Sequence, residues 1–376
     1  MPDLQEEKLN IIRLSRTHGI TNQMFQKALA IYGSATAIVQ NINSISKKTS
    51  NIKLCDLDTI KCELEELSKN NSKIITYLDK EYPSYLKNID SYPLTITCKG
   101  NLDLLKNERK LAIIGSRNCS INNFNFAKTT ARDISDYGYV IVSGMAKGID
   151  SAAHIGSLEN GTIAVLGTDI NNIYPKENEY LYYEILDKNG LIISEFPLGT
   201  KLKPENFPIR NRIIAGLSRG VLIVSAGLKS GTIHTANQAI KYGREVLVFP
   251  GNPYDEGCFG SNRLLQQGAT MVIDIRDIIE SLEKFMPLNM NENFSNLNDN
   301  IEVFKDEYQG DDNLVQDEPK SLEESILSKL DFTPVEITEL LNSLNGDIGE
   351  INSIITCLNL DGKVIIEGGK ICLRRS

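Results

Sequence analysis

The residues best suited to binding chemistry lie between Lys201 and Ser218, where cations gather beside an aromatic ring. Residues 201–212 hold four cations and one anion, namely Lys201, Lys203, Arg210, Arg212 and Glu205. Pro208 restricts the backbone just before the two arginines, so the guanidinium groups sit on a stiff frame. A flat ring, here Phe207, beside planar guanidinium groups suits an unpaired base next to its phosphate. The segment therefore predicts an anion-binding patch.

A second anion-binding feature is the turn Gly115-Ser116-Arg117, which follows a short aliphatic run. With Ser120 as the N-cap of a following helix, this turn would direct backbone N–H groups and one guanidinium toward the edge of a sheet, where a phosphate fits. The turn lacks the G-x-G-x-x-G spacing, and no acidic ribose-binding residue follows at the expected distance. We therefore expect no dinucleotide cofactor.

Two more small-residue turns each allow two interpretations. Asp150, at the end of the turn over residues 143–150, has the chemistry of a general base, but no partner nucleophile is evident. We favour helix capping by Asp150, with His154 packed beneath it. The turn Ser230-Gly231-Thr232 either binds an anion or allows tight packing of a strand on a helix through Gly231, and the sequence favours neither.

Residues of the kind that enzymes and metal sites use do not assemble into a recognisable set. The chain has no P-loop lysine signature, no G-x-S-x-G elbow and no paired metal-binding carboxylates. Its seven cysteines form no C-x-x-C pair, and it has three histidines. We therefore expect no catalytic residue, no cofactor and no metal.

The elements that must position these turns are predicted by a series of short aliphatic runs. These cover residues 111–114, 139–142, 162–166, 191–193, 221–224 and 246–249. Continuous apolar runs indicate strands buried on both faces, and the segments between them indicate right-handed helical crossovers. The fold class is therefore α/β, an extended Rossmann-like, doubly wound, mostly parallel sheet. Such sheets bind ligands at the carboxyl ends of their strands, where every one of the small-residue turns falls.

The chain divides into four predicted parts. Residues 1–70 show helical spacing interrupted by glycines and predict a small helical domain of the SAM or helix-hairpin-helix kind, although a plain packing domain fits equally well. Residues 71–286 form the sheet domain. Residues 287–320 are rich in Asn, Asp and Glu and predict an acidic flexible linker. Residues 321–376 predict three helices and a hairpin, a winged-helix domain.

Charge restricts where a nucleic acid could bind. The net charge is −9, and residues 108–286 carry 19 basic and 19 acidic groups, so a binding site must be a local cluster. Residues 321–376 carry 5 basic and 9 acidic groups, which favours contact with protein over contact with duplex DNA. No apolar run approaches the roughly 20 residues needed to span a bilayer, and the first residues do not form a signal peptide. We expect a cytoplasmic protein without membrane contact.

The motifs taken together resemble the DprA/Smf family of DNA-processing proteins. Their order matches that family from about Tyr82 to Ala269. The motifs are Gly115-Ser-Arg117, Ser143-Gly-x-Ala-x-Gly-Ile-Asp150, Tyr174-Pro-Lys176, Phe207-Pro-x-Arg-Asn-Arg212 with Ile214-Ala-Gly-Leu-Ser218, Ser230-Gly-Thr232, Pro250-Gly251 and Gly260-Ser-Asn-Arg-Leu-Leu265. The helical front and the winged-helix end agree with the family's domain layout.

The resemblance implies a single-stranded DNA-binding protein that protects incoming DNA during natural transformation and helps to load the RecA recombinase. It implies phosphate contacts from Arg117, Lys176 and Arg210 and stacking by Phe207. Further candidates for DNA contact are Asn211, Arg212, Ser116, Gly115, Lys147 and Lys203. The family also forms homodimers, which would place two pockets along one strand. His234 stands where many members carry an apolar residue, so no shared role is expected for it.

A different class of function remains open beside this one. Rossmann-like families related to phosphoribohydrolases place a Gly-Thr turn under a nucleoside monophosphate and cleave or sense it. Such an enzyme needs a glutamate at the glycosidic bond, for which Glu195 is the obvious candidate, although a salt-bridge or capping role suits it equally.

Overall fold

The computed structural model describes residues 3–46, 52–284 and 321–374. The predicted acidic linker, residues 287–320, lies outside the described residues. Among those described, no helix is both long enough and apolar enough to cross a membrane.

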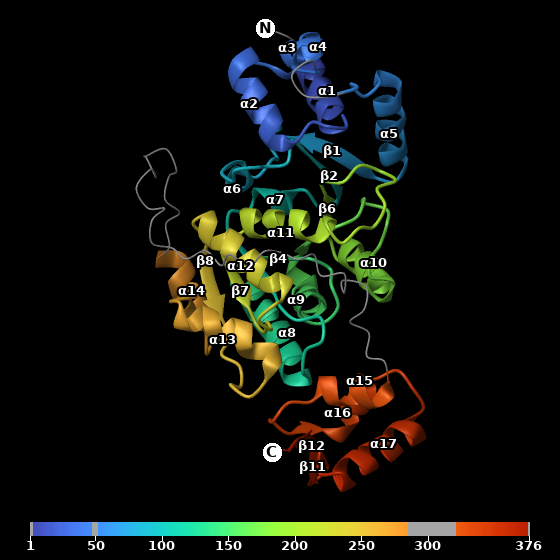
Figure 1. Ribbon diagram of the computed structural model, residues 1–376, viewed down its shortest axis with the longest axis vertical. Helices are drawn as coiled ribbons and strands as arrows, with labels where there is room; N and C mark the ends of the chain where they lie inside the picture. Colours follow the sequence, from blue (N-terminus) through green and yellow to red (C-terminus); the bar gives the residue numbers. More distant parts are fainter. Residues whose placement is uncertain (1–2, 47–51, 285–320, 375–376) are drawn as a thin grey trace.

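A nine-stranded sheet forms the centre of the molecule (Figure 1). In spatial order its strands are β1 (Ser72–Thr76), β2 (Thr95–Gly100), β6 (Leu191–Ser194), β5 (Thr162–Val165), β4 (Val140–Ser143), β3 (Lys110–Ile114), β7 (Gly220–Ile223), β8 (Glu245–Val248) and β9 (Thr270–Met271). The strands from β6 to β9 pair in parallel, whereas β2 pairs antiparallel with both β1 and β6. The predicted doubly wound, mostly parallel sheet is confirmed.

Helices cover both faces of this sheet, which is why its strands read as continuous apolar runs. One face packs against α8 (Ile121–Asp136), α9 (Ile149–Gly156), α10 (Glu179–Asp187) and α14 (Ile275–Lys284). The other face packs against α11 (Asn206–Leu217), α12 (Gly231–Lys241) and α13 (Phe259–Gln266). Successive side chains of β3 point to opposite faces of the sheet. Leu111 and Ile113 pack on the face covered by α8 and α9, whereas Ala112 and Ile114 pack on the face covered by α11 and α12.

The strand order contains a switch point beside β3. From β3 the chain builds β4, β5 and β6 on one side and then returns to add β7 and β8 on the other. The loops that leave the carboxyl ends of β3 and β7 therefore diverge and leave a crevice between them. Short elements join the larger ones: α6 (Ser84–Lys87), α7 (Asp103–Lys106), and the 3-10 turns η1 (Leu158–Asn160), η2 (Lys176–Asn178) and η3 (Glu256–Cys258).

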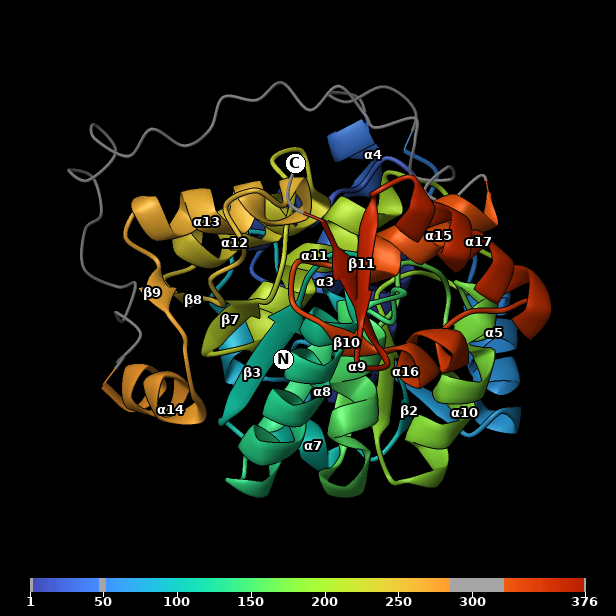
Figure 2. The same ribbon diagram turned by 90° about the horizontal axis from the view of Figure 1, so that it is seen from below.

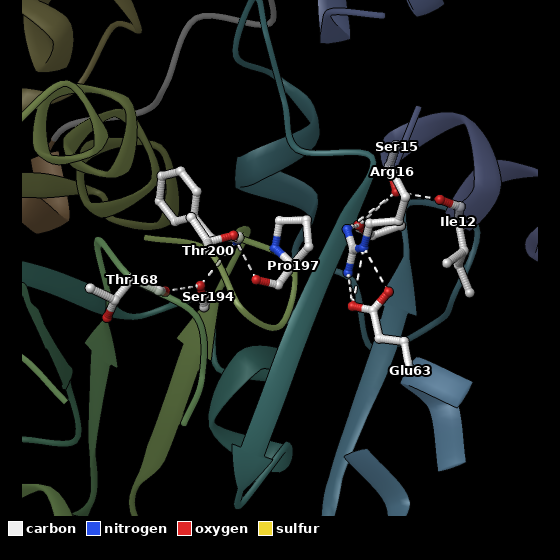
Figure 3. A network of polar contacts seen from close by, with 10 residues as sticks. Ile12, Ser15, Arg16, Glu63, Thr168, Ser194, Pro197 and Thr200 are labelled. Atoms are coloured by element: carbon white, nitrogen blue, oxygen red, sulfur yellow. Dashed lines mark hydrogen bonds and ion pairs between the residues drawn. The ribbon is translucent and has the colours of Figure 1, made fainter. Parts of the chain in front are cut away.

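The amino-terminal helices pack on the β1–β2 end of the sheet (Figure 1). They are α1 (Leu4–Ser15), α2 (Asn22–Tyr32), α3 (Ala35–Gln40), α4 (Ile42–Ser46) and α5 (Leu57–Lys69). Arg16 joins these parts. Its guanidinium pairs with the Glu63 carboxylate at 3.0 Å (Figure 3). The same guanidinium donates to Thr95 Oγ1 of β2 at 3.0 Å. The same view shows Ser194 Oγ donating to the Thr168 carbonyl, a bond that fixes the loop after β5.

Residues 321–374, here called the C-terminal module, form three helices and a small antiparallel sheet. Its elements are α15 (Leu322–Lys329), β10 (Val335–Glu336), α16 (Ile337–Asn342), α17 (Ile348–Leu360), β11 (Val364–Glu367) and β12 (Lys370–Leu373). The strand order is β10-β12-β11, so the hairpin predicted at the end of the chain gains a third, short strand. The helices and hairpin predicted for this region are confirmed.

Candidate nucleic-acid-binding pocket

A cavity of about 370 Å³ opens at the switch point of the sheet, between the loops that follow β3 and β7. Three segments predicted from the sequence meet in its wall, although they lie far apart along the chain. The predicted site residues in the wall are Gly115, Ser116, Arg117, Phe207, Arg210, Asn211, Ser230, Gly231 and Thr232. Crossover connections bring these segments together because each returns the chain to the same edge of a parallel sheet.

Phe207 is the aromatic centre of this pocket. The Cζ atom of Arg117 lies 5.4 Å from its ring centroid, and that of Arg210 lies 5.9 Å away. The Tyr174 ring lies 5.7 Å from it at an interplanar angle of 47°. A Cβ atom on Gly167, after β5, would lie 3.0 Å from Phe207 Cδ1, so the small residue there leaves room for the ring. A ring with two guanidinium groups is therefore present, but it is formed by Arg117 and Arg210 and not by the predicted neighbours Arg210 and Arg212.

Arg210 lines the pocket, but its hydrogen bonds are made to the protein. Its side chain is buried, and Nη1 donates to the Gly144 carbonyl and, at 2.5 Å, to the Val165 carbonyl. Its Nε donates to Asn211 Oδ1 at 3.0 Å. Burial lowers the pKa of Arg210 to about 10, and nearby Asp150 opposes that shift. Arg210 thus ties the ends of β4 and β5 together and keeps a positive charge beneath the cavity.

Asp150 closes the loop after β4. Its Oδ2 accepts hydrogen bonds from the N–H groups of Gly144 at 3.1 Å and Ala146 at 3.4 Å. Burial raises the pKa of Asp150, while the Arg210 charge and these two N–H groups lower it. The N-cap of α9 is Gly148, at φ 74°, so the expectation that Asp150 caps this helix was wrong. A Cβ at Gly148 would lie 2.4 Å from the Ser116 carbonyl oxygen, so only glycine lets the two loops cross here.

His154 lies fully buried beneath this loop, as expected from the sequence. Thr162 Oγ1 donates to the Ile141 carbonyl and lies 2.9 Å from His154 Nδ1, so it accepts the Nδ1 proton. Nε2 then carries no proton, and it has no hydrogen-bond partner among the described residues. Burial, followed by the Arg210 charge, lowers the pKa of His154 to about 3.

This buried imidazole predicts an acid-sensitive fold. Because the unfolded chain binds a proton below about pH 6.5 and the folded chain does not, stability falls as the pH falls from there toward 3. We expect the His154 contribution to unfolding free energy to drop by about 2 kcal/mol between pH 7 and pH 5. The comparison is urea unfolding of the wild type and of His154→Asn, whose amide can still donate to Thr162. Equal pH dependence in both proteins would show that His154 is not the group that titrates.

Arg212 and Glu195 form a buried ion pair outside the pocket wall. Arg212 Nη2 contacts both carboxylate oxygens of Glu195, at 2.5 Å for Oε1. Their side chains are 10% and 16% exposed, and Asn22 Nδ2 of α2 donates to Glu195 Oε1 at 2.8 Å. Neither residue lines the cavity. The salt-bridge role considered for Glu195 is thus the one seen, and Arg212 faces the α2 side of α11.

Three predicted lysines lie outside the cavity wall. Lys147 forms an ion pair with Glu177 at 2.7 Å, whereas Lys176 and Lys203 are exposed at the start of η2 and just before α11. Lys229, which was not predicted as a site residue, is an exposed cation in the cavity wall directly before Ser230. Its place next to a turn with the chemistry to bind an anion was the signal that could have identified it.

The turn at Ser230 begins α12. Ser230 Oγ accepts a hydrogen bond from the Thr232 N–H at 3.2 Å and so caps the helix. A side chain at Gly231 would meet no atom within 4 Å, so close packing does not require glycine there. Of the two interpretations of this turn, tight packing is therefore excluded, and the bare backbone at Gly231 lies open at the cavity wall. His234, one turn further on, also lines the cavity and lies 3.0 Å from Gln238 Nε2.

Comparison with known proteins places the sheet domain among DNA-processing proteins. The family model described as DNA recombination-mediator protein A matches residues 73–283. The chain is 40% identical over 221 residues to DNA processing protein DprA of Streptococcus pneumoniae, covering 58% of this chain and 77% of that one. It is also 38% identical over 227 residues to protein Smf of Escherichia coli, covering 60% of each chain.

Two solved structures are similar to this one. The X-ray structure of DNA processing protein A from Streptococcus pneumoniae has a TM-score of 0.62 and 31% identity, and the match covers 74% of this chain and 98% of that chain. The structure of DNA processing protein A from Helicobacter pylori, described for its single-stranded DNA binding mode, has a TM-score of 0.52 and 31% identity. That match covers 57% of this chain and 96% of that chain.

Proposed function

The chain belongs to the DNA recombination-mediator protein A family, and on that basis we propose that it binds single-stranded DNA without sequence preference. The observation that carries this proposal is the pocket at the switch point. There the Phe207 ring, the Arg117 guanidinium and the open backbone at Gly231 converge on one cavity. A ring supports stacking of an unpaired base, and the other two groups suit the phosphate beside it.

Sequence tolerance follows from the chemistry of these groups. Aromatic rings stack on any base, and guanidinium, lysine and backbone N–H groups read phosphates, which carry no sequence information. We propose that Arg117 and Lys229 contact phosphates directly and that buried Arg210 contributes its charge from below. Exposed Lys176 and Lys203 then extend the cationic path outside the cavity, whereas Lys147 would have to exchange its ion pair with Glu177 for a phosphate.

The biological role that fits this binding is protection of incoming single strands and loading of the RecA recombinase during transformation or recombination. The family description as a recombination mediator supports it, as does the single-stranded DNA binding mode described for the Helicobacter pylori relative. A homodimer would place two pockets along one strand and increase affinity by avidity.

Fluorescence anisotropy with labelled oligonucleotides tests the binding proposal. We expect similar affinity for different single-stranded sequences, weaker binding of duplex, and affinity that falls steeply with salt. Calorimetry with nucleoside monophosphates tests the enzyme alternative in parallel. Tight mononucleotide binding without oligonucleotide binding would replace the proposal with that alternative.

Phe207 is predicted to supply the stacking energy. Base–aromatic stacking contributes about 1–3 kcal/mol per base, so Phe207→Ala should weaken single-strand binding by about tenfold or more. Phe207→Tyr keeps a ring and should bind within about threefold of wild type. The salt dependence of both variants should match wild type, because no phosphate contact is removed. Equal losses in both variants would mean that ring stacking is not the interaction Phe207 provides.

A further inference from the structure

The C-terminal module is docked on the amino-terminal turns of α8. Ile121, the first residue of α8, is 5% exposed and belongs to the apolar core of the module, together with Ile326 and Leu330. Asn122 Nδ2 donates to Asp331 Oδ1 at 3.0 Å and to the Thr333 carbonyl at 3.2 Å. Figures 1 and 2 both show the module at this end of α8.

A second polar contact lies one turn further along α8. Asn125 Nδ2 donates to Glu339 Oε1 of α16 at 2.6 Å. We call Ile121, Asn122 and Asn125 the docking strip. It combines one buried aliphatic side chain with three hydrogen bonds, two of them to carboxylates. A contact of this size is small compared with the interface of a stable complex, so it suits reversible docking.

The docking strip adjoins the wall of the pocket. Arg117 and Asn118 line the cavity and stand four and three residues before Ile121. The module therefore lies beside the part of the cavity wall that leads into α8.

The charge of the docked module opposes a nucleic acid. Residues 321–376 carry 9 acidic and 5 basic groups. Docking places the carboxylates of Asp331 and Glu339 at the amino-terminal turns of a 16-residue helix, where the helix dipole favours anions. A DNA backbone that passes Arg117 and continues over α8 would meet these carboxylates and the bulk of the module.

We propose that the C-terminal module is an intramolecular competitor of single-stranded DNA, and that its release from the docking strip opens the pocket to a longer stretch of strand. The proposal rests on the proposed function. When a binding-competent state is only fractionally populated, apparent affinity falls by that fraction. A module docked about nine-tenths of the time would thus weaken binding by about tenfold.

The test uses the full-length chain with Asn122→Ala and Asn125→Ala combined. This variant removes the polar contacts of the docking strip without changing charge, and alanine favours the helix. Small-angle X-ray scattering without DNA should show a larger radius of gyration. Anisotropy with a labelled deoxythymidine oligonucleotide should show roughly three- to tenfold tighter binding. Thr129→Ala, at an exposed position of the same helix, is the matched control and should leave both measurements unchanged.

Ile121→Ser is a second variant expected to release the module. It removes the apolar contact of the docking strip, again without changing the charge. Release of the module with unchanged or weaker DNA binding would overturn the proposal. An unchanged scattering profile in both variants would also overturn it, because the module would then not be held by the docking strip. Failure of the wild-type chain to bind single strands would instead refute the proposed function, and the DNA-free scattering separates the two cases.

Discussion

Replacing Arg117 and Lys229 together by glutamate should weaken single-stranded DNA binding by about 100-fold or more while the chain stays folded. Both residues line the pocket, on the loops after β3 and β7. A hydrogen bond to a charged group contributes about 1.5–3 kcal/mol, so loss of two such contacts lowers affinity by roughly two orders of magnitude or more. The introduced carboxylates would add repulsion toward the phosphates.

Salt titration of wild type and variant is the sharpest measurement. Each lost phosphate contact should reduce the slope of log affinity against log salt by about 0.7 for a single strand. Lys27→Glu combined with Lys69→Glu is the matched control, because it reverses two exposed cations on α2 and α5 and changes the net charge equally. Equal weakening in the control would mean that net charge, and not the pocket, governs binding. Arg210 is unsuitable for this test because its guanidinium holds β4 and β5.

Replacing Glu195 by alanine should lower the free energy of unfolding by about 3–5 kcal/mol, because it leaves the Arg212 charge buried without its partner. The loss of stability should include that of the hydrogen bond from Asn22 of α2, which donates to the same carboxylate. Urea unfolding measures the effect. DNA affinity of the folded protein should stay within about twofold of wild type, because neither partner lines the cavity.

Removing both charges distinguishes the effect of the unpaired Arg212 charge on stability from the effect of lost side-chain packing. The double variant Glu195→Ala with Arg212→Met leaves no unpaired charge and should be more stable than Glu195→Ala alone. If the single variant unfolds like wild type, the pair does not support the fold. If Glu195→Ala instead abolishes cleavage of a nucleoside monophosphate at unchanged stability, Glu195 is a catalytic residue and the enzyme alternative is supported.

Six of the sheet's strands were predictable because each is buried on both faces and therefore reads as an unbroken aliphatic run. The edge strands β1 and β9, and β2 beside β1, were not predicted. Burial in β1 is mixed, and β9 spans two residues, so neither shows the continuous apolar pattern. β2 is buried but contains two threonines and a cysteine. Its place in the sheet depends on antiparallel pairing with β6, a contact distant in sequence.

Local residue chemistry was sufficient to predict that Phe207, Arg117 and the turn at Ser230 lie together, and all three do line one cavity, because parallel strands bring such turns to one edge of the sheet. The role of each cation depended on the folded chain. Arg210 bonds to carbonyls 66 and 45 residues away, Arg212 pairs with a carboxylate 17 residues away, and exposed Lys229 reaches the pocket wall. The docking of the C-terminal module on α8 was not predictable from the sequence either, because it depends on contacts more than 200 residues apart. A sequence pattern reports what a segment can bind, whereas long-range packing determines which of its donors and charges are already used within the protein.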